Sequence, residues 1–478
     1  MINRRDLLKL TAAGGALAAL PLERGVASLV SEGPAPSRPF TAAMPVPAVL
    51  TPAARTTAAD VYRVRMSEIS TEIIPGLHTT VRTYGGRFPA PTIRAARGRP
   101  VIVHQANGLG VGTSVHLHGG HVAPEHDGHP MDVLAPGASR AYHYPNDQPA
   151  AALWYHDHAH LLESENVYRG LHAAYLISDL AERSLGLPAG RYEVPLQIRD
   201  ARIEADGTLT YTRAQDRPHI LVNGRERPFF RVEARRYRLR IYNFSVDRLL
   251  RLQLADGTTV TQVGTDGGLL PAPVPLTELR MSSGERADVV VDFGRYRPGT
   301  SVVLQNANAL PTENADVMRF DVVAATGPDQ SRVPDRLVEL PPVPPATVQR
   351  DFVLRFDRPT LKYVINDQLY DPDRVDVRTR RGTSEIWTIT NADTPAPPPN
   401  FHLNHNFHTH LAQFRVLDRN GVPVGPAEAG LKDVVLVAPG DTVRIALTWT
   451  TYTGRYVVHC HQLPHSGEAQ MATVEILP

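Results

Sequence analysis

Short runs in which apolar and polar residues alternate fill most of this chain, and sustained helical periodicity is almost absent. Runs of this kind, rich in β-branched residues and separated by Pro and Gly, are typical of β-strands with one buried face. The pattern therefore predicts an all-β protein built from β-sandwiches.

Two strand patterns recur three times along the chain. A basic residue leads into an alternating strand that ends on Asn at Arg99–Asn107, Arg236–Asn243 and Arg381–Asn391. A Gly turn leads into a second alternating strand at Pro136–Tyr144, Ser283–Asp292 and Pro439–Trp449. Spacings of roughly 150 residues predict three copies of one domain. We expect these domains at residues 45–185, 186–331 and 347–478, with the proline-rich segment Arg332–Ala346 as a linker.

The segment that follows the second strand differs between the copies. It contains histidines in the first and third copies, at Tyr155–His158 and Val458–His461, but it reads Leu304–Ala307 in the second. We therefore expect the second domain to carry no metal and to act as a spacer.

Charge and composition argue against a nucleic-acid-binding protein. The 478 residues carry a formal net charge of +1, and nearly all basic residues are Arg, with Lys only at 9, 362 and 432. No basic stripe of the kind that binds nucleic acid is present in the sequence.

The N-terminus has the features of an export signal. Paired arginines, Arg4 and Arg5, precede an uncharged run of small and apolar residues from Leu10 to Leu22. That run is too short to span a bilayer, and its lack of charge disfavours an ordinary amphipathic helix. We predict a twin-arginine signal peptide over residues 1–27, export to the periplasm, cell wall or medium, and no stable membrane insertion.

Histidine clusters contain ten of the twenty histidines and the only cysteine. Residues two apart in a strand point to one face, so each His-x-His pair aims two imidazoles at one place, and four such pairs can surround a metal cluster. Cys460 faces away from its flanking histidines. With His405 and His465 it forms the two-nitrogen, one-sulfur set of a blue copper site. The four pairs are His116/His118, His156/His158, His408/His410 and His459/His461.

A single cysteine in an exported chain is inert, intermolecular or a ligand. Its position between two histidines favours the ligand. A tetrahedral zinc site needs only four ligands, so it would leave most of these histidines unexplained.

The order and spacing of these clusters resemble the multicopper oxidases over nearly the whole chain. Near the ligands the sequence is most similar to the bacterial laccase group, which includes spore-coat laccases and bilirubin oxidases. The segments that carry the likeness are Val115–Gly120, Leu153–His158 and Asn166–Leu171. The resemblance implies three Greek-key cupredoxin β-sandwich domains and four copper ions.

The resemblance also implies a role for each ligand. Type 1 copper takes His405, Cys460 and His465, and type 2 copper takes His116 and His408. The type 3 pair takes His118, His156, His158, His410, His459 and His461. Domains one and three would then each supply four imidazoles to a trinuclear cluster at their interface.

Three further residues are candidates for an axial copper ligand or for proton transfer: Met471, Asp127 and Glu468. The family's axial position beside type 1 copper is Gln470 here; either a one-residue bulge brings in Met471, which we favour, or Gln470 binds. Asp127 is our candidate proton donor to dioxygen, although an Asp-Gly turn residue explains it equally well. The family's glutamate after the last ligand histidine is replaced by Ser466, for which Glu468 is a possible substitute.

The expected function is oxidation of phenols or aromatic amines at type 1 copper, coupled to four-electron reduction of dioxygen to water. The protein would be a monomer with small-molecule partners only. A first alternative is a metal oxidase acting on Cu(I) or Mn(II), but only seven Met residues are present, and Met-rich segments are what Cu(I) would favour. A second alternative, a copper-free cupredoxin scaffold, is disfavoured by the complete ligand set, and a two-domain nitrite reductase is disfavoured by the third repeat.

Overall fold

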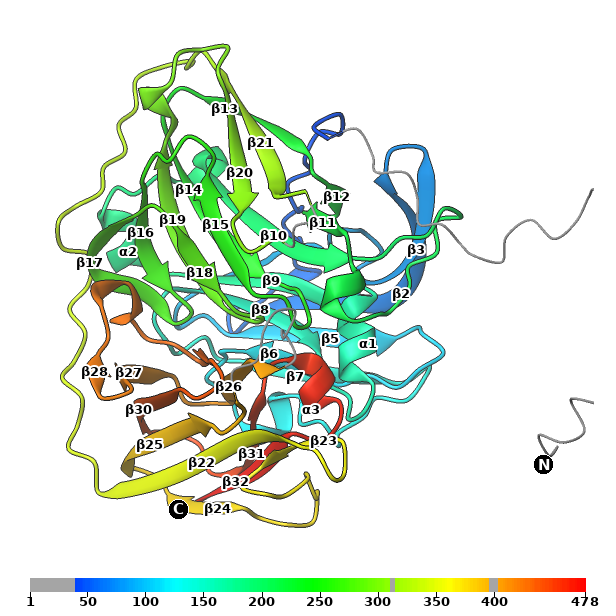
Figure 1. Ribbon diagram of the computed structural model, residues 1–478, viewed down its shortest axis with the longest axis vertical. Helices are drawn as coiled ribbons and strands as arrows, with labels where there is room; N and C mark the ends of the chain where they lie inside the picture. The colour runs from blue at the N-terminus through cyan, green and yellow to red at the C-terminus, as the bar shows by residue number, and fades with distance from the viewer. Residues whose placement is uncertain (1–38, 310–313, 395–402) are drawn as a thin grey trace, which may run out of the picture.

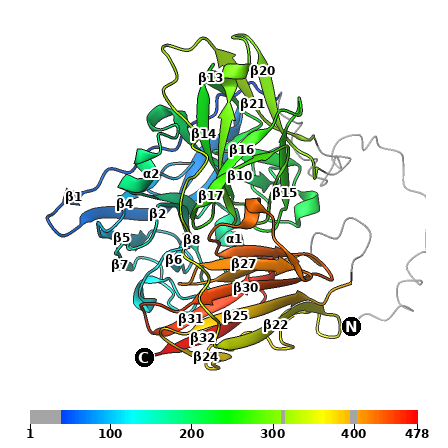
Figure 2. The same ribbon diagram turned by 90° about the vertical axis from the view of Figure 1, so that its left-hand side faces the viewer.

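The computed structural model describes residues 39–309, 314–394 and 403–478, and these residues form an almost entirely β structure. The predicted signal peptide lies outside the described residues. Within them, the sheets group in chain order into three sandwiches (Figures 1 and 2). No helix among them is long and apolar enough to cross a membrane.

The first sandwich encloses a core that includes Tyr62, Val103 and Tyr142. One sheet has the order β1-β2-β5-β7, with β3 paired to β2, and the other the order β4-β9-β8-β6. The strands are β1 (Ala54–Arg55), β2 (Asp60–Ile74), β3 (Leu77–Tyr84), β4 (Ile93–Ala96), β5 (Val101–Asn107), β6 (Val115–His118), β7 (Ser139–Tyr144), β8 (Ala151–Asp157) and β9 (His172–Ser178).

The second sandwich has its own core around Leu239, Val289 and Phe320. Its sheets have the orders β12-β11-β10-β14-β19-β16-β17 and β13-β21-β20-β15-β18. The strands are β10 (Glu193–Ala201), β11 (His219–Val222), β12 (Arg225–Glu226), β13 (Phe229–Glu233), β14 (Arg236–Asn243), β15 (Leu250–Leu254), β16 (Val260–Thr265), β17 (Gly268–Leu276), β18 (Leu279–Met281), β19 (Arg286–Asp292), β20 (Ser301–Asn306) and β21 (Asp316–Val323).

The third sandwich packs around Trp387, Phe407 and Ile445. Its sheets have the orders β23-β22-β25-β30-β27-β28 and β24-β32-β31-β26-β29. The strands are β22 (Val348–Asp357), β23 (Lys362–Ile365), β24 (Val377–Arg380), β25 (Ser384–Asn391), β26 (His405–Thr409), β27 (Phe414–Arg419), β28 (Val422–Pro423), β29 (Val434–Val437), β30 (Thr442–Thr448), β31 (Gly454–Cys460) and β32 (Met471–Leu477).

The repeat seen in the sequence is visible in the strand pairing. In each sandwich the strand that ends on Asn pairs with a parallel partner on one side and with the strand after the Gly turn, antiparallel, on the other. These trios are β2-β5-β7, β10-β14-β19 and β22-β25-β30. In β5, buried and half-buried positions alternate, as the hydrophobic pattern predicts.

Three short α-helices connect the strands in the described residues: α1 (Glu163–Tyr168), α2 (Leu180–Ser184) and α3 (Leu463–Ser466). Figure 1 shows α1 and α3 side by side where the first sandwich meets the third. Strands β6 and β26 lie at the same junction, so the histidine segments of both sandwiches converge there.

Candidate copper centres

Two pairs of neighbouring strands present the histidines. His116 in β6 lies opposite His156 in β8, and His408 in β26 lies opposite His459 in β31. The second histidine of each of the four pairs lies at the end of its strand or one residue past it. All ten candidate histidines and Cys460 are buried.

His405, Cys460 and His465, which we call the sulfur site, converge within the third sandwich. The Cys460 Sγ lies 3.5 Å from the Nδ1 atoms of both His405 and His465. Those two nitrogens are 3.2 Å apart. Burial raises the pKa of the Cys460 thiol to about 12, so its thiolate requires a bound cation.

Two side chains support the rings of the sulfur site from outside. The Asp393 carboxylate lies 3.0 Å from His405 Nε2. The Tyr363 ring stacks on His465, with 3.6 Å between ring centroids. Each ring is therefore held with Nδ1 turned toward the sulfur.

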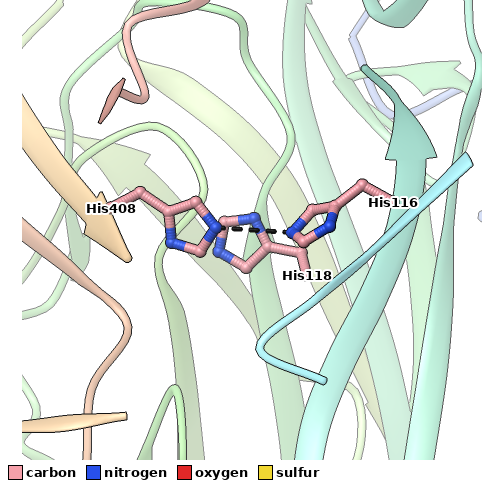
Figure 3. A group of neighbouring side chains, drawn as sticks. All are labelled: His116, His118 and His408. Carbon is pink, nitrogen blue, oxygen red and sulfur yellow. Dashed lines mark hydrogen bonds between the residues drawn. The ribbon is translucent and has the colours of Figure 1, made fainter. Parts of the chain in front are cut away.

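The other eight histidines, which we call the imidazole cluster, gather between the first and third sandwiches. His118, His156 and His461 form one group of three, and His158, His410 and His459 form another. His116 and His408 come together beside His118, and their Nε2 atoms are 3.4 Å apart (Figure 3). Each group contains imidazoles from both sandwiches.

Protein oxygen atoms hold the outward nitrogen of most of these rings. Backbone carbonyls lie 2.6–3.0 Å from Nδ1 of His116, His156, His408 and His459. His118 is turned the other way, since its Nε2 lies 3.0 Å from Asp433 Oδ1. Partners of this kind fix the tautomer and orientation of metal-binding histidines.

Several ring nitrogens of the imidazole cluster have lone pairs that no protein group uses. His118 Nδ1, His156 Nε2 and both ring nitrogens of His461 are buried without a hydrogen-bond partner. Burial and, after it, neighbouring imidazoles lower the pKa of His118, His408 and His461 well below the usual value. Neutral imidazoles with free lone pairs suit copper, so the residues present fit the metal.

His158 is the exception to this electrostatic pattern. Burial lowers its pKa, but the Glu163 carboxylate outweighs burial, and the net pKa of His158 is raised. Glu163 Oε2 lies 2.7 Å from His158 Nδ1, and both side chains are fully buried.

Asp127 lies at the edge of the imidazole cluster. Its Oδ2 is 2.6 Å from His410 Nδ1, and its Oδ1 is 3.5 Å from His116 Nδ1. Gly128 has a φ of +78°, and any side chain there would collide with the Val115 carbonyl. The glycine therefore lets the Asp127 loop approach β6 closely.

The structure contradicts the expected position of Glu468. Its side chain is 47% exposed and lies near Lys362 on the surface, because α3 ends before it and the chain turns outward. Ser466, in contrast, is buried and its hydroxyl donates to Glu163.

Met471 also departs from its expected place. The ladder between β31 and β32 runs without a register shift from Gly454↔Ile476 to His459↔Met471, so no bulge of the predicted kind occurs there. Met471 packs with Tyr370 and Val457. Just past the end of this ladder, the Cys460 N–H donates to the Gln470 carbonyl at 3.2 Å.

The Gln470 side chain is held beside strand β23. It is fully buried, its Nε2 donates to the Val364 carbonyl at 3.0 Å, and its Oε1 has no partner. Val364 follows Tyr363, which covers His465. Gln470 thus carries a buried side-chain oxygen without a hydrogen-bond partner, on a residue whose backbone is bonded to Cys460.

Sequence reasoning missed a polar network that the second sandwich contributes. Arg286 in β19 donates to Asp433 Oδ1 at 2.7 Å and to the Ala152 carbonyl at 2.9 Å. Lys432 lies 2.9 Å from both Asp266 and Glu285. A signal was available, because Lys is rare in this chain and Lys432-Asp433 directly precedes an apolar strand.

Comparison with known proteins agrees with this chemistry. Family models described as multicopper oxidase match residues 65–182 and 339–478, and a model of the twin-arginine translocation signal matches residues 1–21. The chain is 35% identical to a laccase of Bacillus subtilis (strain 168), with 91% of this chain and 98% of the laccase aligned. It is 33% identical to a bilirubin oxidase of Albifimbria verrucaria, over 91% and 80% of the two chains.

A solved structure gives the same result for the fold. The laccase of Pediococcus acidilactici superimposes with a TM-score of 0.84 at 31% identity, covering 93% of this chain and 95% of that one. The chain belongs to the multicopper oxidase family. It is a laccase-like copper oxidase of three cupredoxin domains, exported by the twin-arginine route, which confirms the predicted fold class, cofactor and enzyme class.

Proposed function

We propose that the protein couples one-electron oxidation of phenols or aromatic amines at the sulfur site to reduction of dioxygen to water at the imidazole cluster. The observation that carries this proposal is the path through Cys460. Its sulfur lies between two imidazoles, while its chain neighbours His459 and His461 belong to different groups of the imidazole cluster. A single covalent segment therefore joins a one-electron site to a multi-electron site.

The ligand roles form part of the proposal. His405, Cys460 and His465 hold type 1 copper, and His116 and His408 hold type 2 copper. The remaining six imidazoles hold the type 3 pair, as two groups of three. Bound copper supplies reversible one-electron redox chemistry and, at the trinuclear site, the binding of dioxygen.

The chain's own residues orient these ligands and move protons. Asp393 and Tyr363 hold the rings of the sulfur site, and Asp433 holds His118. Asp127 is the nearest carboxyl group to both His116 and His410, so we propose that it delivers protons during dioxygen reduction.

Gln470 is the residue that we propose for the axial position of type 1 copper, in place of Met471. Its partnerless Oε1 and its backbone hydrogen bond with Cys460 support this choice. Glutamine oxygen is a known weak axial ligand in blue copper sites, and the axial ligand helps to set the reduction potential.

The remaining parts of the proposal concern the molecule as a whole. We propose domains at residues 45–185, 186–331 and 347–478, a monomeric state, and a location in the periplasm, the cell wall or the medium. The second domain binds no copper in this scheme.

The test is spectroscopic and kinetic. Copper-loaded protein should show the intense visible absorption of a blue copper site and should consume oxygen with phenols, aromatic amines or bilirubin. Uptake with Cu(I) or Mn(II) but with no aromatic reductant would identify a metal oxidase instead. Protein that binds copper without a blue band would refute the assignment of the sulfur site.

A further inference from the structure

The contact between helices α1 and α3 contains a buried carboxylate that links the two halves of the imidazole cluster. Glu163 begins α1 in the first domain, and Ser466 ends α3 in the third. Both are fully buried. One carboxylate oxygen of Glu163 accepts a hydrogen bond from the Ser466 hydroxyl, and the other lies 2.7 Å from His158 Nδ1.

The contact with Glu163 determines which ring nitrogen of His158 is available to a metal ion. With Nδ1 facing the carboxylate, Nε2 points inward and lies 3.1 Å from Nε2 of His459, a residue of the third domain. The neighbouring rings His156 and His459 rest on neutral backbone carbonyls. Glu163 thus gives His158 an anionic partner, which holds the ring and raises its basicity as a ligand.

Glu163 is itself held in place. Its backbone N–H donates to the Ala159 carbonyl at 2.9 Å. Farther along α1, Asn166 donates to the buried carboxylate of Asp157 at 2.8 Å. The helix is short, but it is anchored to the end of β8, the strand that leads into His158.

We propose that Glu163 is a positioning residue for His158, and that Glu163 and Ser466 form a matched pair of one carboxylate and one hydroxyl across the interface between domains one and three. The proposal rests on the ligand role of His158 in the proposed function. Two carboxylates in contact at a buried interface repel each other, so the carboxylate and the hydroxyl can be exchanged but the carboxylate cannot be doubled.

The first test removes the carboxylate. Glu163→Ser should keep the blue band, because the sulfur site lies within the third domain, and should lower copper retention or reoxidation by air about 10–100-fold. The fraction of copper detectable by electron paramagnetic resonance should rise, since a disturbed type 3 pair loses its magnetic coupling. Glu163→Gln keeps the shape without the charge and should fall between Glu163→Ser and the wild type.

The matched control is Glu165→Ser on the same helix, where Glu165 is a surface residue paired with Arg169. It should match the wild type in copper content, resonance signal and reoxidation. If Glu163→Ser or, should that variant not fold, Glu163→Gln also matches the wild type, the positioning role is refuted.

The second test exchanges the two groups. Ser466→Glu alone should disturb the type 3 signal, because it places a second carboxylate against Glu163. The double variant Glu163→Ser with Ser466→Glu should recover at least half of the wild-type copper content and resonance signature. Additive losses in the double variant would refute the matched pair.

These outcomes separate this inference from the proposed function. If the proposed function is wrong, the wild-type protein itself lacks the blue band or the coupled copper pair. If only this inference is wrong, the wild type is normal, and either the Glu163 variants are normal too or the double variant shows additive losses.

Discussion

The sulfur site and the imidazole cluster differ in how much of the chain each one needs. The three side chains of the sulfur site come from a single domain, with Asp393 and Tyr363 of the same domain behind them. The imidazole cluster takes its side chains from the first and third domains. The second domain also takes part, because its Arg286 donates to Asp433 of the third domain. A site within one domain tolerates a shift between domains, whereas a site built across an interface does not.

The comparison predicts that removing the sulfur of Cys460 stops the reactions at both the sulfur site and the imidazole cluster. Cys460→Ser should be colourless and should show no measurable oxygen uptake, because electrons from the substrate no longer enter. Absorption spectra and an oxygen electrode measure both effects. A Cys460→Ser protein that stays blue would overturn the assignment.

Damage to the imidazole cluster should leave the sulfur site working. In His410→Ala or His118→Ala, substrate should still bleach the blue colour without air, since the two sites share no imidazole. The colour should then fail to return when air is admitted. Normal reoxidation in both variants would place the dioxygen site elsewhere.

The role of the second domain can be tested at Arg286. Arg286→Met leaves the Asp433 carboxylate buried without its guanidinium, which costs about 3–5 kcal/mol, and should release copper from the imidazole cluster before the sulfur site. Arg251→Met is the matched control, because Arg251 is 45% exposed and pairs with Glu278 at the surface, where a pair is worth about 0–1 kcal/mol. Thermal unfolding and copper analysis compare the two; equal effects would mean that the second domain is only a spacer.

A smaller effect on activity is expected from removing the proposed proton donor, Asp127. Asp127→Asn keeps an acceptor for His410 but no carboxyl proton, so reoxidation by air should slow about tenfold, the low end of general acid catalysis. The blue band and its bleaching should be unchanged. Asp132→Asn, a change at a half-exposed surface residue, should reoxidise normally, and a normal rate in Asp127→Asn would direct the search to another group.

The smallest effect concerns the axial position of the sulfur site. Gln470→Met should raise the reduction potential of the blue copper, because a thioether stabilises the oxidised ion less than an amide oxygen does. Met471→Leu should leave the potential unchanged. Redox titration of the blue band distinguishes the two variants, and a shift only in Met471→Leu would reinstate Met471 as the axial residue.

Alternation in strands explains why so much was predictable. A period of two within single strands predicts that the histidines of each His-x-His pair share a face and that Cys460 points to the opposite face from its flanking histidines. The same alternation marks the strands of the three repeats. The structure departs from the expectations for Met471 and Glu468 in the short segment after His465, where α3 and the register of β32 decide which side chains point inward. Sequence spacing contains no information about that choice.

The residues that were missed act across interfaces. Glu163 meets Ser466, and Arg286 meets Asp433, only after the domains have packed together. No local period brings such pairs together. The sequence marks Lys432-Asp433 as unusual, but which residues pair across the interfaces is seen only in three dimensions.

The distance along the chain between the two ends of the imidazole cluster has a consequence for biosynthesis. Its first ligand segment is His116–His118 and its last is His459–His461, close to the C-terminus. Domains emerging from the ribosome fold in order from the N-terminus, so the first domain forms long before its partner imidazoles exist. A complete imidazole cluster therefore requires that the third domain has been synthesised and has folded, which suits the folded cargo of the twin-arginine route indicated by the N-terminal signal.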